Sequence, residues 1–320
     1  MRPIITDPTH LKNKILILTY IFRSLPYLYL EGTATPLHKR QELREIVKNL
    51  ENTQFLTKKT AMHALSFLNL TKKGHEFVTR SLLPRSTDSQ PFYAYRSFRS
   101  LRGTVSEHQY MNFAFVWDWI GNNTSVLQKN IEIYEDSNIN QCKLRFLHGG
   151  KTVILSPDVL ILYPDTIVNN GLMPPQFYKK AIIVENDTGG ETHKTFFRKF
   201  VEYAMLIKQL RQSRISGGEL VFIFHSQQRA ENLFFADQGM TQFITNYNDT
   251  PKVKDVHNYD ILSAYLNSEL QVKYSVFDKE NPTSSYEFRP YNFGEQLLKQ
   301  YPKWKTYLQL ETTNYRLGKK

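Results

Sequence analysis

Two short apolar runs that lead into acidic residues constrain this chain more than any other feature. The first run, Val153–Leu155, leads into Ser-Pro-Asp and ends at Asp158, and the second, Ala181–Val184, leads directly into Glu185. Short runs rich in Val and Ile are typical of buried strands. If the two strands are neighbours in one sheet, both carboxylates lie at the same edge of that sheet.

A pair of carboxylates on neighbouring strands is a natural site for Mg²⁺ or Mn²⁺, because these cations prefer hard oxygen ligands. A divalent cation at such an edge can promote hydrolysis of phosphodiesters. The same residues also have simpler interpretations. Pro157-Asp158 is common where a strand ends in a turn, and Asp187 can cap the turn-like sequence Asp-Thr-Gly-Gly. Glu185 is harder to explain in this way, because an acid that follows Ile-Ile-Val is costly if it is buried without a partner.

The composition places the excess of positive charge in the first third of the chain. Residues 1–105 carry 17 Lys or Arg and 7 Asp or Glu, whereas residues 106–320 carry 24 and 23. Clustered cations favour nucleic acid as a partner, because phosphates reward them through counterion release. A basic domain with no such partner is the alternative.

The length of 320 residues suggests about two domains. A single cysteine, Cys142, cannot form an internal disulfide, and no run of about 18 apolar residues occurs. The best apolar stretch, residues 15–30, contains Arg23 and Pro26 and reads as a core helix rather than a signal peptide. We therefore expect a cytoplasmic protein that does not insert into a membrane.

Residues 1–90 are expected to form a DNA-binding domain. Apolar residues at helical spacing predict a helix over residues 9–30 and another from Pro36 through Val47, and residues 53–64 are ambiguous. A strand over residues 65–70 should then lead into the basic turn Thr-Lys-Lys-Gly at residues 71–74 and a helix to residue 82. This order resembles a winged helix-turn-helix domain. A small helical domain with a solvated charged face is the alternative.

The winged-helix interpretation gives the basic residues of this segment a role against phosphate. The candidate DNA-binding residues there are Lys39, Arg40, Arg44, Lys72 and Lys73.

Residues 91–105 read as a linker between two domains, because Pro, Ser and Thr precede it and apolar periodicity is weak. Its three arginines, Arg96, Arg99 and Arg102, are interleaved with aromatic residues, an arrangement that can hold single-stranded DNA by charge and stacking. Packing of this linker onto a neighbouring domain would use the same residues.

Residues 106–245 follow an α/β pattern. The expected elements are helices over residues 106–120 and 192–211 and strands over residues 129–134, 141–147, 153–162, 180–185 and 219–224. Residues 246–320 show less clear periodicity and are expected to be an accessory segment.

Taken in order along the chain, several motifs resemble the PD-(D/E)xK nuclease fold, and more narrowly the replication-relaxation proteins of mobile plasmids and the related MOBC-type relaxases. The resemblance covers about residues 30–235. It is carried by Leu-Thr-Lys-Lys-Gly, Glu107-His108, Ser156-Pro157-Asp158, Glu185-Asn186-Asp187-Thr188, Arg198 to Tyr203, and the strand before His225 with Arg229 after it.

The resemblance implies an α/β (α+β) protein with a winged helix-turn-helix domain and a restriction-endonuclease-like domain. It implies binding of double-stranded and single-stranded plasmid origin DNA, metal-dependent nicking of one strand, and other transfer or replication proteins as partners. Asp158, Glu185 and Asp187 would be the metal ligands, and Lys199 and His108 would complete the catalytic set. Further site candidates are Glu107, Lys194, Tyr203, His225 and Arg229.

One position departs from the family pattern, which has lysine two residues after Glu185, where this chain has Asp187. Lys199 on the following helix can replace that lysine, with Lys194 as a second candidate, or Asp187 can join the metal as a third carboxylate. If neither holds, the nuclease-like domain is inactive and the protein only binds DNA. Each of the single residues also has a structural interpretation: Lys199 and Tyr203 as a surface pair, His108 as a structural histidine, and His225 and Arg229 in a solvated loop.

Overall fold

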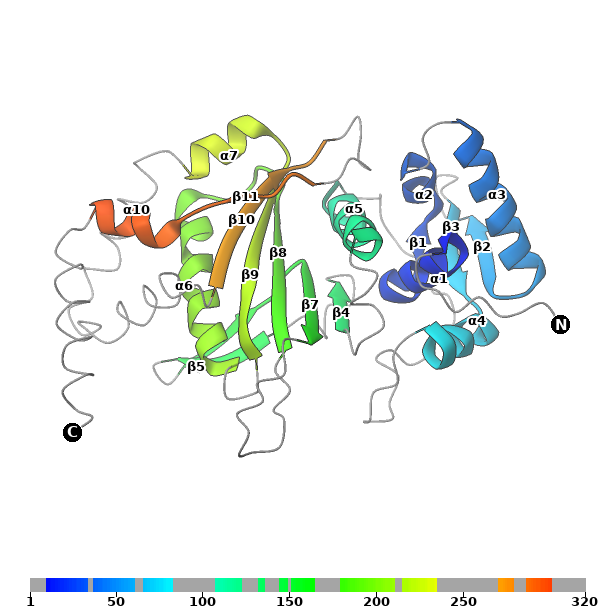
Figure 1. The fold of residues 1–320 in the computed structure, drawn as a ribbon, viewed down its shortest axis with the longest axis horizontal. Coiled ribbons are helices and arrows are strands. Elements are labelled where there is room, and N and C mark those ends of the chain that lie inside the picture. The colour runs from blue at the N-terminus through cyan, green and yellow to red at the C-terminus, as the bar shows by residue number, and fades with distance from the viewer. Residues whose placement is uncertain are drawn as a thin grey trace, which may run out of the picture. The chain divides into compact units, whose positions relative to one another are not determined.

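A computed structural model describes residues 10–33, 37–60, 66–82, 107–122, 132–135, 144–148, 151–164, 179–210, 215–234, 270–278 and 286–300. The chain divides into two compact units, which interleave along the sequence. Unit 1 comprises residues 1–142, 156–164 and 277–286, and unit 2 comprises residues 143–155, 165–276 and 287–320. The predicted boundary at residues 91–105 lies outside the described residues. The helices and strands of both units make this an α/β protein (Figure 1).

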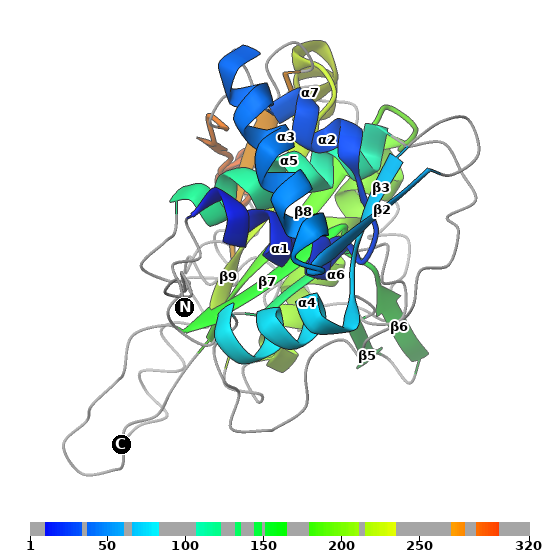
Figure 2. The same cartoon turned by 90° about the vertical axis from the view of Figure 1, so that its right-hand side faces the viewer.

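The N-terminal part of unit 1 alternates helices with three short strands. In chain order it contains α1 (Leu11–Phe22), β1 (Leu25–Pro26), α2 (Tyr27–Thr33), α3 (Leu37–Asn52), β2 (Leu56–Thr60), β3 (Ser66–Leu70), α4 (Lys72–Phe77) and the π-helical turn η2 (Val78–Leu82). The strands form an antiparallel sheet in the order β1-β3-β2. Figure 2 shows β2 and β3 side by side, with α3 next to α2.

The helix expected over residues 9–30 is interrupted in the structure. It ends at Phe22, Arg23 adopts a positive φ of 58°, and β1 follows at Leu25–Pro26. Proline restricts the residue before it to extended backbone and cannot donate to the preceding helical turn, so Pro26 sits in β1 rather than inside a helix. By contrast, α3 agrees with the expectation, and its apolar face of Leu43, Val47 and Leu50 is buried.

The basic sequence Thr-Lys-Lys-Gly is not a wing between two strands. Thr71 accepts a hydrogen bond from the Gly74 backbone N at 3.0 Å and caps α4, so Lys72 and Lys73 form the first turn of that helix. A Cβ at Gly74 would lie 2.0 Å from the Phe55 carbonyl oxygen. Glycine is therefore required here by close backbone packing, and the motif has a structural explanation that sequence reasoning missed.

The remaining described elements of unit 1 are α5 (Glu107–Asn122), β4 (Glu132–Glu135) and β7 (Val159–Pro164), with β4 antiparallel to β7. The strand expected over residues 153–162 is in fact two strands. Ser156 to Asp158 separate β6 (Lys151–Leu155) from β7, because Pro157 cannot donate to a strand ladder. The strand β6 belongs to unit 2, where it pairs with β5 (Leu144–His148) in a separate two-stranded sheet.

Unit 2 is built on a mixed sheet. Its strands lie in the order β8 (Lys179–Asp187), β9 (Ile215–Phe224), β10 (Leu270–Val276) and β11 (Arg289–Pro290). The first three are parallel and β11 is antiparallel to β10. The segment after residue 246, which the sequence left without a role, thus supplies two strands and the helix α10 (Phe293–Gln300).

The helices α6 (His193–Leu210) and α7 (Gln227–Phe234) pack on this sheet (Figure 1). Aromatic side chains fill the space between them. Phe200 stacks on Phe222 at 5.2 Å and on Phe293 at 4.3 Å between ring centroids, and all three are buried. This core fixes the face of α6 that is turned toward β8 and β9, and it sets the position of the site.

Candidate functional site

The acidic end of β8 is buried. Ala181 to Val184 are the apolar centre of the strand, and Glu185 and Asp187 follow with exposed fractions of 4% and 2%. Carboxylates removed from water to this extent require partners. The structure supplies different partners for the two acids.

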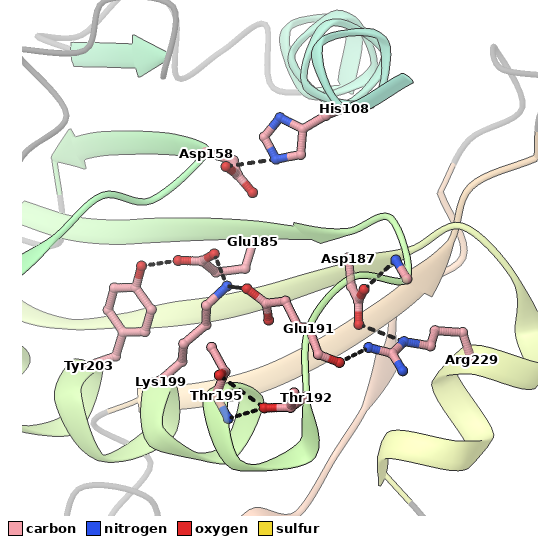
Figure 3. Close-up of polar contacts among 11 residues, drawn as sticks. His108, Asp158, Glu185, Asp187, Glu191, Thr192, Thr195, Lys199, Tyr203 and Arg229 are labelled. Carbon is pink, nitrogen blue, oxygen red and sulfur yellow. Dashed lines mark hydrogen bonds and ion pairs between the residues drawn. The ribbon is translucent and has the colours of Figure 1, made fainter. Parts of the chain in front are cut away.

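Glu185 is bound by two side chains of α6. Lys199 Nζ lies 2.6 Å from Glu185 Oε2, and the Tyr203 hydroxyl donates to Glu185 Oε1 (Figure 3). Lys199 and Tyr203 are four residues apart and therefore lie on one face of the helix. The sequence analysis gave Lys199 on the following helix as one of several ways to replace the missing lysine, and in the structure Lys199 and Glu185 are in direct contact. The side chain of Lys194 is outside the described part of the structure.

A second acid, Glu191, also contacts Lys199. Its Oε1 lies 2.5 Å from Lys199 Nζ, so that one ammonium group is held between two carboxylates (Figure 3). Sequence reasoning missed Glu191, because it belongs to no motif and precedes the start of α6 in a loop. The only sequence signal is an acid close to a helix N-terminus, which is common for reasons of the helix dipole alone.

The electrostatics of this group keep Lys199 charged. Burial by itself would lower the pKa of Lys199, but the adjacent carboxylates of Glu185 and Glu191 outweigh it and raise the pKa above its ordinary value. A lysine with a raised pKa is a fixed positive charge at neutral pH and cannot act as a general base.

Asp187, expected as a metal ligand, is taken up by protein groups. Its Oδ1 accepts a hydrogen bond from the Gly189 backbone N at 2.6 Å, and its Oδ2 is 2.9 Å from Arg229 Nε. The first contact is the turn-capping role that the sequence analysis gave as the alternative. His225 directly follows β9 beside this turn, and its backbone N donates to the Asp187 carbonyl oxygen at 3.1 Å. Arg229 is therefore a residue of α7, and His225 is half-buried in the short segment between β9 and α7.

Asp158 and His108 form a separate contact within unit 1. His108 Nε2 on α5 lies 2.9 Å from Asp158 Oδ1 (Figure 3). One turn along α5, the buried Asn112 donates to Glu135 Oε1 on β4 at 3.0 Å, whereas Glu107 is exposed. Asp158 and Glu185 belong to different units, so their convergence at one sheet edge remains a prediction.

The donor set of unit 2 fits a small divalent cation in one respect. Glu185 and Glu191 both point a carboxylate oxygen at Lys199 Nζ, so the two acids converge on one positively charged group. Mg²⁺ is often bound by one or two carboxylates together with substrate phosphates, so these two residues suit it. Both oxygens of Glu185 are engaged as well, so a cation there would have to displace Lys199. Asp187 differs in that its oxygens are held by a backbone N–H of its own turn and by Arg229. Among the described residues, no group of three His, Cys, Asp or Glu side chains is arranged to hold a metal ion.

The basic residues expected to bind DNA differ in their surroundings. Lys39 and Lys72 are exposed. Arg44 lies 3.3 Å from Glu31, and Lys73 Nζ donates to the Thr53 carbonyl oxygen near the end of α3 at 2.9 Å. Arg40 is half-buried on α3. Arg96, Arg99 and Arg102 lie outside the described residues.

Comparison of the chain with protein-family models, with curated proteins and with solved structures found no match. Among the residues that the structure describes, no helix is both long enough and apolar enough to cross a membrane.

Proposed function

We propose that this protein binds the origin DNA of a mobile plasmid and nicks one strand there. The observation that carries the proposal is the contact of Glu185 with Lys199 and Tyr203. These three positions belong to the motifs that resemble the replication-relaxation and MOBC-type proteins. Lys199 and Tyr203 follow Glu185 by 14 and 18 residues along the chain and lie on a different element. A buried acid, a cation and a hydroxyl in direct contact are groups that phosphoryl chemistry uses.

The N-terminal elements support DNA binding. The order helix, strand, helix, helix, strand, strand with an antiparallel sheet β1-β3-β2 is what a winged helix requires. In such a domain α3 would enter the major groove, and the β2–β3 hairpin would lie against phosphate. Lys39 on α3 and Lys58 and Lys59 on β2 are exposed and would supply positive charge there. The excess of Lys and Arg in residues 1–105 is consistent with this role.

The residues of the β8–α6 site have distinct roles in the proposed reaction. Lys199, kept protonated by its two acidic neighbours, would stabilise the negative charge that develops on the scissile phosphate. Tyr203 would fix the orientation of Glu185 through its hydroxyl. Glu185 and Glu191 would hold a Mg²⁺ or Mn²⁺ ion, which when bound would polarise the phosphate. Access to the two carboxylates requires Lys199 to withdraw from at least one of them.

By the resemblance, Asp158 and His108 would be further members of the catalytic set, single-stranded DNA and other transfer or replication proteins would be partners, and the protein would act in the cytoplasm. A nicking protein of this kind acts on one strand of supercoiled DNA. A restriction or transposon endonuclease would instead cut both strands of linear DNA.

A second candidate is an origin-binding protein with an inactive nuclease-like domain. It is favoured by the full occupation of Glu185, whose two oxygens are bound by Lys199 and Tyr203, and by the presence of Asp187 where the family has lysine. Under this reading the network only stabilises the fold.

Binding and cleavage separate the two candidates. The substrate is a supercoiled plasmid that carries the DNA flanking the protein's own gene, with Mg²⁺ or Mn²⁺ present. Origin binding is measured by gel shift over a range of salt concentrations. Lys39→Ala should reduce the slope of log Kd against log salt by about one, because one phosphate contact is lost. Lys73→Ala, whose ammonium is engaged at the end of α3, should leave that slope unchanged. Retained, salt-sensitive binding without conversion to open circles would favour the second candidate.

A further inference from the structure

The resemblance accounts for one acidic partner of Lys199, but the structure gives it two. Glu191 Oε1 lies 2.5 Å from Lys199 Nζ, at least as close as Glu185. Glu191 is half-buried in the loop between β8 and α6, where side chains are not held by regular secondary structure. Something outside the loop must therefore fix its position.

The loop between β8 and α6 contains two adjacent glycines, which restrict its backbone little. Gly189 has a positive φ of 98°, and Gly190 has no heavy atom within 4 Å of an added Cβ. Adjacent glycines lower the conformational cost of alternative backbone paths. A carboxylate carried by this loop would visit many positions.

Arg229 on α7 holds both ends of the loop. Its Nε donates to Asp187 Oδ2 at 2.9 Å, and its Nη2 donates to the Glu191 carbonyl oxygen (Figure 3). The side chain is only 17% exposed, and its backbone N donates to Ser226 Oγ at 3.3 Å at the start of α7. A guanidinium group offers donors in a rigid fork, which suits it to bridge two fixed acceptors.

We propose that Glu191 is the second acidic residue of the β8–α6 site and that Arg229 is its positioning residue. In this proposal Asp187 binds Arg229 and is not a metal ligand. Arg229 acts by holding the loop that carries Glu191, and it does not contact phosphate. The inference deepens the proposed nicking function and rests on it only for its kinetic consequences. The placement of Glu191 at Lys199 is independent of whether the protein cleaves DNA.

The direct test is a cycle of variants followed by thermal unfolding, without DNA. Glu191→Gln removes the charge that faces Lys199 and should lower the unfolding midpoint by about 3 °C. In an Arg229→Ala background the same substitution should have less than a third of that effect, because the loop no longer holds Glu191 at Lys199. Equal losses in the two backgrounds would overturn the proposal. Arg198→Ala, which breaks an exposed ion pair with Glu202 on α6, is the matched control and should leave the effect of Glu191→Gln unchanged.

Chemical rescue keeps the test decisive if Arg229→Ala folds poorly. Guanidinium at a few millimolar should raise its unfolding midpoint and restore the effect of Glu191→Gln, while methylammonium, which lacks the planar fork, should do neither. If guanidinium rescues stability but Glu191→Gln stays without effect, Arg229 has only a structural role and the proposal fails.

In the nicking assay, Arg229→Ala should lower kcat about tenfold and change KM for DNA less than twofold. A rise in KM alone would identify Arg229 as a phosphate contact and contradict its positioning role. Absence of nicking by the wild type would count against the proposed function, and the unfolding cycle would still decide the inference on Glu191.

Discussion

Lys199 Nζ lies 2.6 Å from Glu185 Oε2, although the two residues belong to α6 and β8. In the family that the chain resembles, the lysine follows two residues after the acid on the same strand, where this chain has Asp187. The contact therefore delivers an ammonium group to the acid from a helix instead of from the strand. Under the proposed function, Lys199 would take the role of the strand lysine.

Replacement of Lys199 should lower the stability of the folded protein, because two carboxylates lose the positive charge that neutralises them. Lys199→Met leaves Glu185 and Glu191 facing each other without a counterion, and we expect a loss of about 3 kcal/mol in the free energy of unfolding. Urea unfolding monitored by circular dichroism measures it. The control is Arg198→Ala, which removes a mainly exposed ion pair with Glu202 and should change stability by less than about 0.5 kcal/mol. A similar small change for both variants would show that Lys199 is not paired in solution.

Tyr203 should contribute through its hydroxyl alone. Tyr203→Phe keeps the buried ring and removes the donor to Glu185 Oε1, which should cost about 2 kcal/mol because the acceptor is charged. The expected effect should fall to about 1 kcal/mol when Glu185 is replaced by Gln, since the amide oxygen still accepts from Tyr203 but the bond is no longer charge-assisted. Additive losses in the double variant would mean that Tyr203 and Glu185 do not interact.

The sequence was sufficient to predict the strand β8, which is a short continuous apolar run, and the helix α6, whose apolar residues recur at helical spacing. It also offered Lys199 on that helix as one candidate to replace the missing lysine. It did not predict Glu191, since a loop residue is placed by contacts such as those of Arg229 that lie far away along the chain. Nor did it predict that Asp187 would be bound by Arg229, because a pairing over 42 residues leaves no local pattern.

Gly74 should be among the least replaceable residues of the N-terminal elements. Gly74→Ala forces a methyl group to within 2.0 Å of the Phe55 carbonyl oxygen, a backbone atom that cannot rotate away. We expect roughly 2–3 kcal/mol of destabilisation, measured by thermal unfolding. Gly190→Ala is the matched control, since nothing lies within 4 Å of its added Cβ. Equal behaviour of the two variants would contradict the packing of α4 against Phe55.

The same glycine shows why the sequence predicts a basic turn where the structure has the start of a helix. Thr-Lys-Lys-Gly looks like a basic turn because Lys and Gly are common in turns, whereas the structure uses Thr71 as a cap and Gly74 for close packing. Similarly, the helix expected over residues 9–30 had good periodicity, but Pro26 broke it. Local sequence pattern predicts the type of element well where tertiary contacts favour the same element. It fails where a backbone constraint, such as those at Gly74 and Pro26, sets the conformation instead.

Lys14 gives a prediction on pH. It is 8% exposed, its Nζ lies 3.9 Å from the Trp117 ring centroid, and burial lowers its pKa to about 8, partly opposed by Asp118. The pKa in the unfolded chain is higher, so the unfolded state binds more protons between pH 8 and about 10 and stability rises with pH in that window. Below pH 8 the penalty for burying the charge is fully present.

Lys14→Met should therefore stabilise the protein at pH 7, by roughly 1–3 kcal/mol, and its advantage should shrink as the pH approaches 9.5. Urea unfolding of both proteins at pH 7 and pH 9.5 measures the difference. The measurements stay below pH 10, because buried tyrosines such as Tyr29 have raised pKa values and make the stability depend on pH above that value. An advantage that does not change with pH would show that Lys14 is not titrating in the folded protein.

The most direct measurement of the central claim is the conversion of supercoiled plasmid to open circles. The plasmid carries the DNA that flanks the protein's own gene, and the reaction contains Mg²⁺ or Mn²⁺. The account predicts nicking by the wild type and by Arg198→Ala, and a loss of at least a hundredfold in Glu185→Gln and Lys199→Met with DNA binding retained. Nicking that persists in both site variants would place the chemistry elsewhere, and absence of nicking by a folded, DNA-binding wild type would contradict the claim.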